Sequence, residues 1–271
     1  MKTVCYVVNL ERATGRRKAI EAELEAAGIT ATFLGAVDIK EVGEDYLRQR
    51  FNDYGPWGIV PPQNMAICSS HLKIWDHFLA TDADLAVVFE DDVYVAPELS
   101  IWLEDLSWWP KDADIVRLEN WPSKSMKHVV GRQGPTFRGR KISRLYTRHP
   151  GSAGYIITRA HAQRLNSIER LSLTTDGLLF NPYVSKWARA AKIYQVNPAL
   201  VTQGNDPSGE QTRRKRKQTG VKRWQQKLKR GWAELSSTPR HLFRIVTGQA
   251  ELLRLSFSKE PLAKTTRKGD A

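Results

Sequence analysis

The clearest candidate for a functional site in this sequence is a run of three consecutive carboxylates, Glu90-Asp91-Asp92. They follow the apolar run 85–89, which is short enough to be a strand buried on both faces. Ligands bind beyond the carboxyl ends of strands in open α/β sheets, and adjacent carboxylates repel one another unless a cation lies between them. A divalent cation with oxygen ligands explains the cluster and could clamp a diphosphate leaving group. A solvated acidic turn is the alternative.

A second polar group follows the first apolar run of the chain, residues 4–10. Asn9 and Leu10, at the end of such a strand, could border a base, and Arg12 and Arg16 could bind phosphates. An ordinary helix start with surface arginines accounts for the same residues. The sequence contains no Gly-x-Gly-x-x-Gly and no Gly-Lys-Ser/Thr loop, which disfavours a dinucleotide-binding fold and a P-loop enzyme.

Further candidate residues lie in the middle of the chain. His71 falls in a segment of helical periodicity, where it could be either a packing residue or a ligand-binding one. Gly154 and Tyr155 end a small-residue segment, which allows either a close approach of backbone to a ligand or a tight turn into a strand. Asp176 precedes an apolar run and could be a general base or a helix cap.

The elements that must position these residues alternate between strand and helix. Helical periodicity predicts helices over 14–27, 65–80 and 159–165, with Gly28 as the stop of the first. Residues 55–63 are expected to form a loop, and 122–150 loops or a small hairpin. Apolar and β-branched runs predict strands over 4–10, 31–37, 85–89, 114–118, 154–158 and 193–196. This alternation predicts an α/β domain with a mostly parallel central sheet.

Charge divides the chain after Asp206. The segment 207–271 holds 17 of the 42 Lys and Arg residues and 5 of the 29 Asp and Glu residues, so it carries +12 of the net charge of +13. The prediction is a nearly neutral domain, 1–206, followed by a basic tail, 207–271, that binds an anionic surface. Within the tail, Trp224, Leu228 and Trp232 recur at helical spacing and predict a basic amphipathic helix. Residues 242–257 predict a second helical segment, and docking on the domain is the alternative for the apolar stripe.

Several classes of protein are disfavoured by the same sequence. No apolar run approaches the roughly 20 residues that span a bilayer, and residues 1–10 do not resemble a secretory signal. Cys5 and Cys68 each lie in an apolar stretch, so neither a disulfide framework nor a cysteine zinc site is expected. A cytoplasmic protein is predicted.

The candidate segments match one known family in order: 7–12 with Arg16-Arg17, 70–75, 88–93, 151–158 and Asp176. On these residues the chain resembles glycosyltransferase family 25, the bacterial lipooligosaccharide and lipopolysaccharide galactosyltransferases and their collagen-modifying relatives. The resemblance covers about residues 3–205. It implies a GT-A-like fold, a nucleotide-sugar donor, a divalent metal ion and inversion at the anomeric carbon.

The resemblance also implies roles for single residues. Asp92 is expected to bind the metal, Mn²⁺ or Mg²⁺, with Glu90 as a partner for the metal or the ribose, and Asp176 to deprotonate the acceptor hydroxyl. Other residues are expected to line the nucleotide-sugar site: Asn9, Leu10, Arg12, Arg16, His71, Asp91, Gly154 and Tyr155. Where the family usually has Glu, this chain has Asn64, which predicts a changed donor or acceptor preference.

The prediction is therefore a metal-dependent inverting glycosyltransferase that moves galactose or glucose from a UDP-sugar to a glycolipid or lipopolysaccharide-core acceptor. It is expected on the inner face of the membrane, held there by 207–271. A nuclease or other nucleic-acid-binding protein is the alternative, but the near-neutral charge of 1–206 argues against it, because a basic groove should lie beside the metal. A family member that is catalytically inactive and only binds through its tail is a third possibility.

Overall fold

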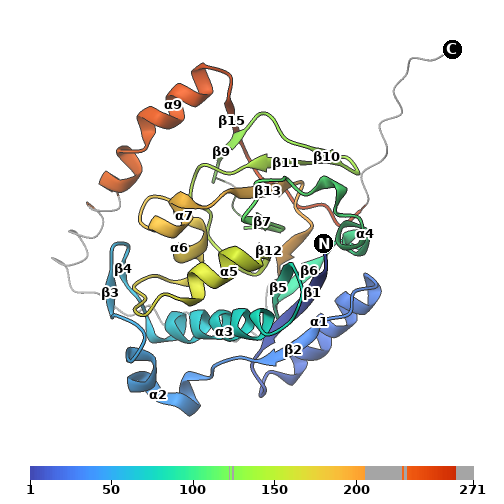
Figure 1. Cartoon of the computed structure of the whole chain (residues 1–271), viewed down its shortest axis with the longest axis vertical. Helices are drawn as coiled ribbons and strands as arrows, with labels where there is room; N and C mark the ends of the chain where they lie inside the picture. Colours follow the sequence, from blue (N-terminus) through green and yellow to red (C-terminus); the bar gives the residue numbers. More distant parts are fainter. Residues whose placement is uncertain (122, 124, 205–227, 229–230, 261–271) are drawn as a thin grey trace.

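The computed structural model describes residues 1–121, 123, 125–204, 228 and 231–260. An eight-stranded sheet forms its centre, in the order β10-β11-β13-β7-β12-β5-β1-β2 (Figure 1). The strands are β1 (Thr3–Asn9), β2 (Thr32–Gly35), β5 (Leu85–Glu90), β7 (Ile115–Arg117), β10 (Thr136–Phe137), β11 (Arg140–Arg144), β12 (Gly154–Thr158) and β13 (Ile193–Asn197).

Helices and short sheets surround this centre. The helices are α1 (Thr14–Ala26), α2 (Ile39–Arg48), α3 (Pro62–Leu79), α4 (Leu99–Glu104), the 3₁₀ turn η1 (Leu106–Trp108), α5 (Arg159–Asn166), α6 (Thr175–Phe180), α7 (Lys186–Ala190) and α9 (Thr238–Val246). Three small sheets pair β6 (Val93–Val95) with β14 (Val201–Gln203) and β8 (Glu119–Asn120), β9 (His128–Gly131) with β15 (Ala250–Leu253), and β3 (Tyr54–Gly55) with β4 (Gly58–Ile59).

Six of the eight central strands run in one direction. β1 is parallel to β2 and β5, and β7 is parallel to β13, whereas β12 runs against both β5 and β7. β11 runs against β10 and β13. The predicted α/β class and mostly parallel central sheet are confirmed.

Alternate side chains of the strands enter two separate cores. In β5, Ala86 and Val88 pack into a core with helices α2, α3, α5 and α6, while Val87 and Phe89 pack into a second core with α1 and α4. Successive side chains of a strand point to opposite faces, so a strand covered on both faces must be apolar throughout. The continuous run 85–89 has this pattern for that reason.

The first helix ends where its sequence predicted. Gly28 has φ +68°, its N–H donates to Glu25 O at 2.9 Å, and the N–H of Ile29 donates to Leu24 O at 2.9 Å. These two bonds form a Schellman motif, which needs the left-handed backbone that glycine adopts at little cost. The carboxyl end of β1, with Asn9, is thereby joined to β2 by one compact helical crossover.

The expected small hairpin within 122–150 is present as β10 and β11, which pair in antiparallel fashion, but this segment also supplies β9, and its basic residues are not all on the surface. Arg140, the first residue of β11, is completely buried. Its guanidinium donates to Glu98 Oε1 at 2.5 Å and to the carbonyl oxygens of Pro198 and Ala199 at 2.9 and 2.8 Å. A basic sequence enters the interior here because other segments supply its acceptors.

The predicted helix over 242–257 is also corrected. α9 ends at Val246, and after Gly248, with φ +72°, the chain forms β15, which pairs with β9 at four positions. Residues 231–235 are helical, as expected, whereas Trp224 lies outside the described residues. The boundary at 206 stays a prediction. Within the described residues, no helix is both long and apolar enough to span a membrane.

Candidate active site

Asn9, Glu90 and Gly154 meet at one edge of the central sheet. β1 and β5 both end there, since Val8 lies opposite Glu90 in their parallel register, and β12 begins there with Gly154 opposite Phe89. The acidic triplet therefore lies at the carboxyl ends of two parallel strands, where open α/β sheets bind their ligands.

Asp91 is held by two partners from the first 16 residues. Asn9 Nδ2 donates to Asp91 Oδ2 at 2.6 Å, and Arg16 Nη1 lies 3.1 Å from Asp91 Oδ1. Burial raises the pKa of this carboxyl, and the charge of Arg16 and the hydrogen bond from Asn9 oppose that effect. Both carboxylate oxygen atoms of Asp91 are therefore engaged by protein groups, and these contacts fix the end of β5.

Glu90 faces the helix α3. Ser152 Oγ donates to Glu90 Oε1 at 2.9 Å, and His71 Nε2 lies 3.5 Å from the same oxygen. Burial acts to raise the pKa of Glu90, but the interactions with His71 and Ser152 outweigh it, and the pKa is lowered. Glu90 is therefore an ionised carboxylate that the protein orients.

A buried hydrogen-bonded chain stands behind Glu90. Trp75 Nε1 donates to the Tyr155 hydroxyl at 3.1 Å, and that hydroxyl lies 2.8 Å from His71 Nδ1. Indole N–H can only donate, so the Tyr155 hydroxyl accepts from Trp75 and makes its other hydrogen bond with His71 Nδ1, while His71 Nε2 is turned toward Glu90. His71 and Tyr155 are fully buried, so they present no surface to a ligand and act through Glu90.

Asp92 differs from its two neighbours. Its Oδ1 atom is buried and has no hydrogen-bond partner among the described residues. Burial first, and then the charges of Glu90 and Asp91, raise its pKa to about 7. A buried carboxylate oxygen without a partner is costly, and a bound cation would remove that cost.

Arg117 and Glu119 join this site, although the sequence reasoning did not select them. Arg117 Nη2 lies 3.0 Å from Glu119 Oε2, both side chains are fully buried, and the backbone N–H of Ala153 donates to the same oxygen at 2.9 Å. Burial raises the pKa of Glu119 to about 7, against the opposing charge of Arg117. The charge of Glu119 also contributes to the raised pKa of Asp92, so these two carboxylates are electrostatic neighbours.

A sequence signal for Glu119 existed. It follows the predicted strand 114–118 in the way that Glu90-Asp91-Asp92 follow 85–89. Parallel strands bring such positions to one edge of a sheet, and β7 and β5 are indeed separated only by β12.

Asp176 lies in the first turn of α6. Thr174, not Asp176, is the cap of this helix: its hydroxyl accepts from the N–H of Gly177 and donates to Asp176 Oδ1. The charge of Asp176 contributes to the raised pKa of Glu119, which places it near the Arg117–Glu119 pair. Asp176 is partly exposed.

The remaining predicted residues are less directly involved. Arg12 Nε lies 2.5 Å from Asp38 Oδ2 and lowers the pKa of that carboxyl, so this guanidinium has a protein partner at the start of α2. Leu10 and Asn64 are partly exposed, and Asn64 lies in the first turn of α3. Gly154 is buried, and a Cβ there would lie 2.8 Å from Val201. Its small size serves close packing against β14.

The donor set fits one kind of metal site. Among the described residues, no three His, Cys, Asp or Glu side chains are grouped to hold an ion by themselves. Mg²⁺ is commonly bound by one or two carboxylates together with substrate phosphates, and the unpaired Asp92 Oδ1 fits that pattern. An all-protein cage does not fit the described residues.

Comparison with known proteins identifies the family. Residues 2–179 match the model of glycosyltransferase family 25, described as an LPS biosynthesis protein. The chain is 29% identical over 212 residues to the lacto-N-neotetraose biosynthesis glycosyltransferase LgtE of Neisseria meningitidis serogroup B, covering 73% of each chain.

Two further relatives agree with this match. The chain is 27% identical to the lipooligosaccharide biosynthesis protein lic2B of Haemophilus influenzae, covering 73% of this chain and 75% of that one. It is also 27% identical to LgtB of the same Neisseria strain, covering 73% of this chain and 74% of that one. A nuclease is thereby set aside, and the chain belongs to glycosyltransferase family 25 and is a glycosyltransferase.

Proposed function

We propose that this glycosyltransferase moves a hexose, galactose or glucose, from a UDP-sugar to a glycolipid or lipopolysaccharide-core acceptor, with inversion at the anomeric carbon. The observation that carries the proposal is the unpaired, buried Oδ1 of Asp92 beside Glu90 and Glu119 at the carboxyl ends of parallel strands. The printed names of the relatives, which concern lacto-N-neotetraose and lipooligosaccharide biosynthesis, support the acceptor class.

In this proposal Asp92 holds a divalent cation, Mn²⁺ or Mg²⁺, together with the donor's diphosphate. When bound, such an ion stabilises the negative charge that develops on a departing diphosphate. Glu90 is pre-oriented by His71 and Ser152 and can accept hydrogen bonds from the ribose hydroxyls of the donor. Asn9 and Arg16 contribute indirectly, because they fix Asp91 and with it the backbone that carries Asp92.

Asp176 is proposed as the base that takes the proton of the acceptor hydroxyl. The oxygen of that hydroxyl attacks the anomeric carbon, and UDP leaves from the opposite face. Thr174 fixes one of the Asp176 oxygen atoms by a hydrogen bond, and the side chain is partly exposed, as a group that meets the acceptor must be. Glu119 carries a pKa near 7 but is fully buried and ion-paired with Arg117, so it is assigned to the electrostatics of the site.

A glycolipid acceptor lies in a membrane, so the proposed location of the enzyme is the cytoplasmic face of the membrane, as a peripheral protein. The sequence of 207–271 carries +12 of the net charge, and basic residues near an anionic leaflet contribute about 1 kcal/mol each. On α9, Leu242, Phe243 and Val246 are 55%, 63% and 83% exposed, which suits insertion into the interface region of a bilayer.

Donor hydrolysis tests the catalytic part of the proposal. UDP release from UDP-galactose and UDP-glucose is measured for the full chain with Mn²⁺ and with a chelator, for wild type, Asp92→Asn and the exposed control Asp45→Asn. We expect metal-dependent release that falls about 100-fold or more in Asp92→Asn and is unchanged in Asp45→Asn, because the lost charge stabilisation is worth several kcal/mol.

Two outcomes would contradict the proposal. Equal metal dependence in a folded Asp92→Asn variant would mean that the ion is held elsewhere. Absence of release and of UDP binding in the wild type would rule out a UDP-hexose donor, and UDP binding without release from either sugar would indicate a catalytically inactive family member.

A further inference from the structure

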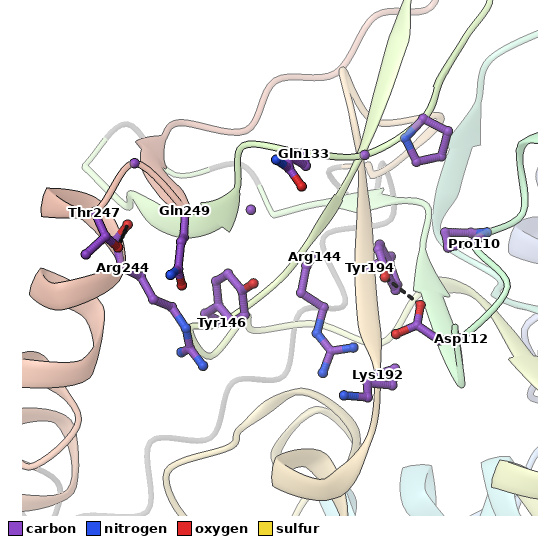
Figure 2. A pocket seen from close by; sticks show the side chains of 14 residues that line it. Pro110, Asp112, Gln133, Arg144, Tyr146, Lys192, Tyr194, Arg244, Thr247 and Gln249 are labelled. Carbon is purple, nitrogen blue, oxygen red and sulfur yellow. Dashed lines mark hydrogen bonds between the residues drawn. The ribbon is translucent and has the colours of Figure 1, made fainter.

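A cavity of about 720 Å³ lies at the edge of the sheet opposite to the candidate active site. Lys192 directly precedes β13, and Asp112 precedes β7 by three residues, whereas the catalytic carboxylates follow the carboxyl ends of the parallel strands. The other walls come from β11 and from the turn between α9 and β15 (Figure 2). The cavity is therefore separate from the donor site and has no role in the chemistry proposed above.

The cavity is strongly basic. Arg144 of β11, Arg244 of α9 and Lys192, just before β13, line it together, with their side chains in the lower part of the view in Figure 2. Asp112 is the one acidic residue among the 14 that line it, all of them within the described residues. The Tyr194 hydroxyl donates to Asp112 Oδ1 at 2.6 Å, so one of its oxygen atoms is already engaged.

The three cations have no acidic partner among the described residues. Arg144 donates to the carbonyl oxygen of Ala191 at 2.9 Å, and the Arg244 guanidinium lies 4.2 Å from the centre of the Tyr146 ring. The Lys192 ammonium forms no ion pair with any described residue, and only the backbone N–H of Lys192 donates to Asp114. Guanidinium groups held in this way retain free N–H donors, which suit the oxygen atoms of a phosphate.

A neighbouring cavity extends the positive surface. It has a volume of about 440 Å³, shares Arg144 and Arg244 with the first, and adds Arg189 and Arg240. None of its described lining residues is acidic. The two cavities together form one basic depression along the inner side of α9.

The outer side of the same helix is apolar and exposed. Leu242, Phe243 and Val246 are exposed, and their spacing along α9 puts them on one face of the helix. An exposed apolar face of this kind on a folded protein marks an interaction site. An apolar face directly beside a basic depression is the arrangement that binds an anionic membrane, where phosphates lie just outside the acyl chains.

We infer that the basic cavity binds the phosphate of an anionic lipid headgroup while the outer face of α9 contacts the acyl region. The inference rests on the membrane association proposed above and deepens it: the folded domain itself supplies a lipid site. A free phosphate is the other source of the same chemistry, and the experiment separates the two.

Vesicle co-sedimentation of the full chain is the test. One set of vesicles mixes phosphatidylglycerol with phosphatidylcholine, and the other is phosphatidylcholine alone. The variants are Lys192→Gln and Arg244→Gln, with Lys18→Gln as the control that removes one exposed positive charge from α1, away from α9 (Figure 1). We expect binding to the anionic vesicles only, weakened about fivefold by each cavity variant and little by the control.

Three results would overturn the inference. Equal weakening by Lys18→Gln would show unspecific attraction of the whole charge, and full binding in both cavity variants would show that the cavity is not used. Tight binding of inorganic phosphate that Lys192→Gln abolishes, with vesicle binding unchanged, would make the cavity a site for a soluble phosphate. UDP-sugar hydrolysis is measured in parallel and should be unchanged in all variants, so failure of the lipid site is distinguishable from failure of the proposed reaction.

Discussion

His71 Nε2 lies 3.5 Å from Glu90 Oε1, and the other ring nitrogen of His71 lies 2.8 Å from the Tyr155 hydroxyl. Both His71 and Tyr155 are fully buried, on the α3 side of the sheet. His71 and Tyr155, which the sequence suggested as separate ligand-binding residues, therefore form one supporting layer behind the Glu90 carboxylate. A carboxylate whose supports are fixed by packing keeps its orientation when the donor binds.

Removing the Tyr155 hydroxyl tests this layer. In Tyr155→Phe, Trp75 Nε1 and His71 Nδ1 lose their shared partner, so we expect the free energy of unfolding to fall by about 1–3 kcal/mol. Because Glu90 is proposed to bind the donor, we also expect the KM for the UDP-sugar to rise about fivefold. Urea unfolding and donor titrations measure the two effects, with the exposed Tyr46→Phe as control. A loss of stability with an unchanged KM would make the layer structural only.

Asp176→Asn separates base catalysis from donor binding. An amide cannot accept the acceptor's proton, so we expect the transfer rate to fall by about 10²–10⁴ while the affinity for UDP stays within about twofold. The hydroxyl of Thr174 can still hydrogen-bond the amide oxygen, so α6 should remain folded. Transfer kinetics and UDP titration by calorimetry provide the comparison. A parallel loss of UDP affinity would instead place Asp176 in the donor site.

Glu119 should make stability fall as pH rises from about 4.5 through 7. The pKa of Glu119 in the folded chain is about 7, against an ordinary value of 4.5, so the folded state binds more protons than the unfolded state between these values. Stability contributed by that bound proton is present at low pH and is lost as pH rises through 7. For Glu119 alone the loss between pH 6.5 and 8.5 is about 1 kcal/mol.

Urea unfolding at pH 6.5 and pH 8.5 checks this sign. Glu119→Gln should reduce the fall in the free energy of unfolding across this interval, whatever its absolute stability. Glu104→Gln, on the exposed side of α4, is the matched control. If the fall is as large in Glu119→Gln as in the wild type, the raised pKa of Glu119 is not responsible for it.

A chain ending at Asp206 should be much less stable than the full chain. It lacks β15, which covers β9, and Ser258, whose carbonyl accepts from the buried Arg140 at 2.9 Å. Leaving a buried guanidinium donor without its acceptor costs about 1–3 kcal/mol, and the lost packing of Ala250 and Leu255 adds to this. A chain ending at Glu260 retains all these contacts and is the control. Equal urea midpoints for the two chains would show that residues 207–260 do not stabilise the domain formed by 1–206.

Local patterns in the sequence are enough to predict the main elements of the fold. The run 85–89 had to be a strand buried on both faces, and the polar residues after it had to collect at one sheet edge, because apolar continuity and strand direction are local properties of the chain. Gly28 determined where α1 ends, since a left-handed residue is needed there. The excess of positive charge after Asp206 likewise follows from the amino-acid composition of that segment.

Other features were decided only by contacts between distant segments. Arg140 could enter the core because Glu98 and the 198–199 carbonyl groups surround it, and residues 250–253 became a strand because the edge of β9 was unpaired there. Arg16 was read as a phosphate ligand, yet in the folded chain it meets Asp91, which is 75 residues away in sequence. Such polar pairings carry no periodic signal, because the free energy that selects them comes from desolvation and from the partner that tertiary structure supplies.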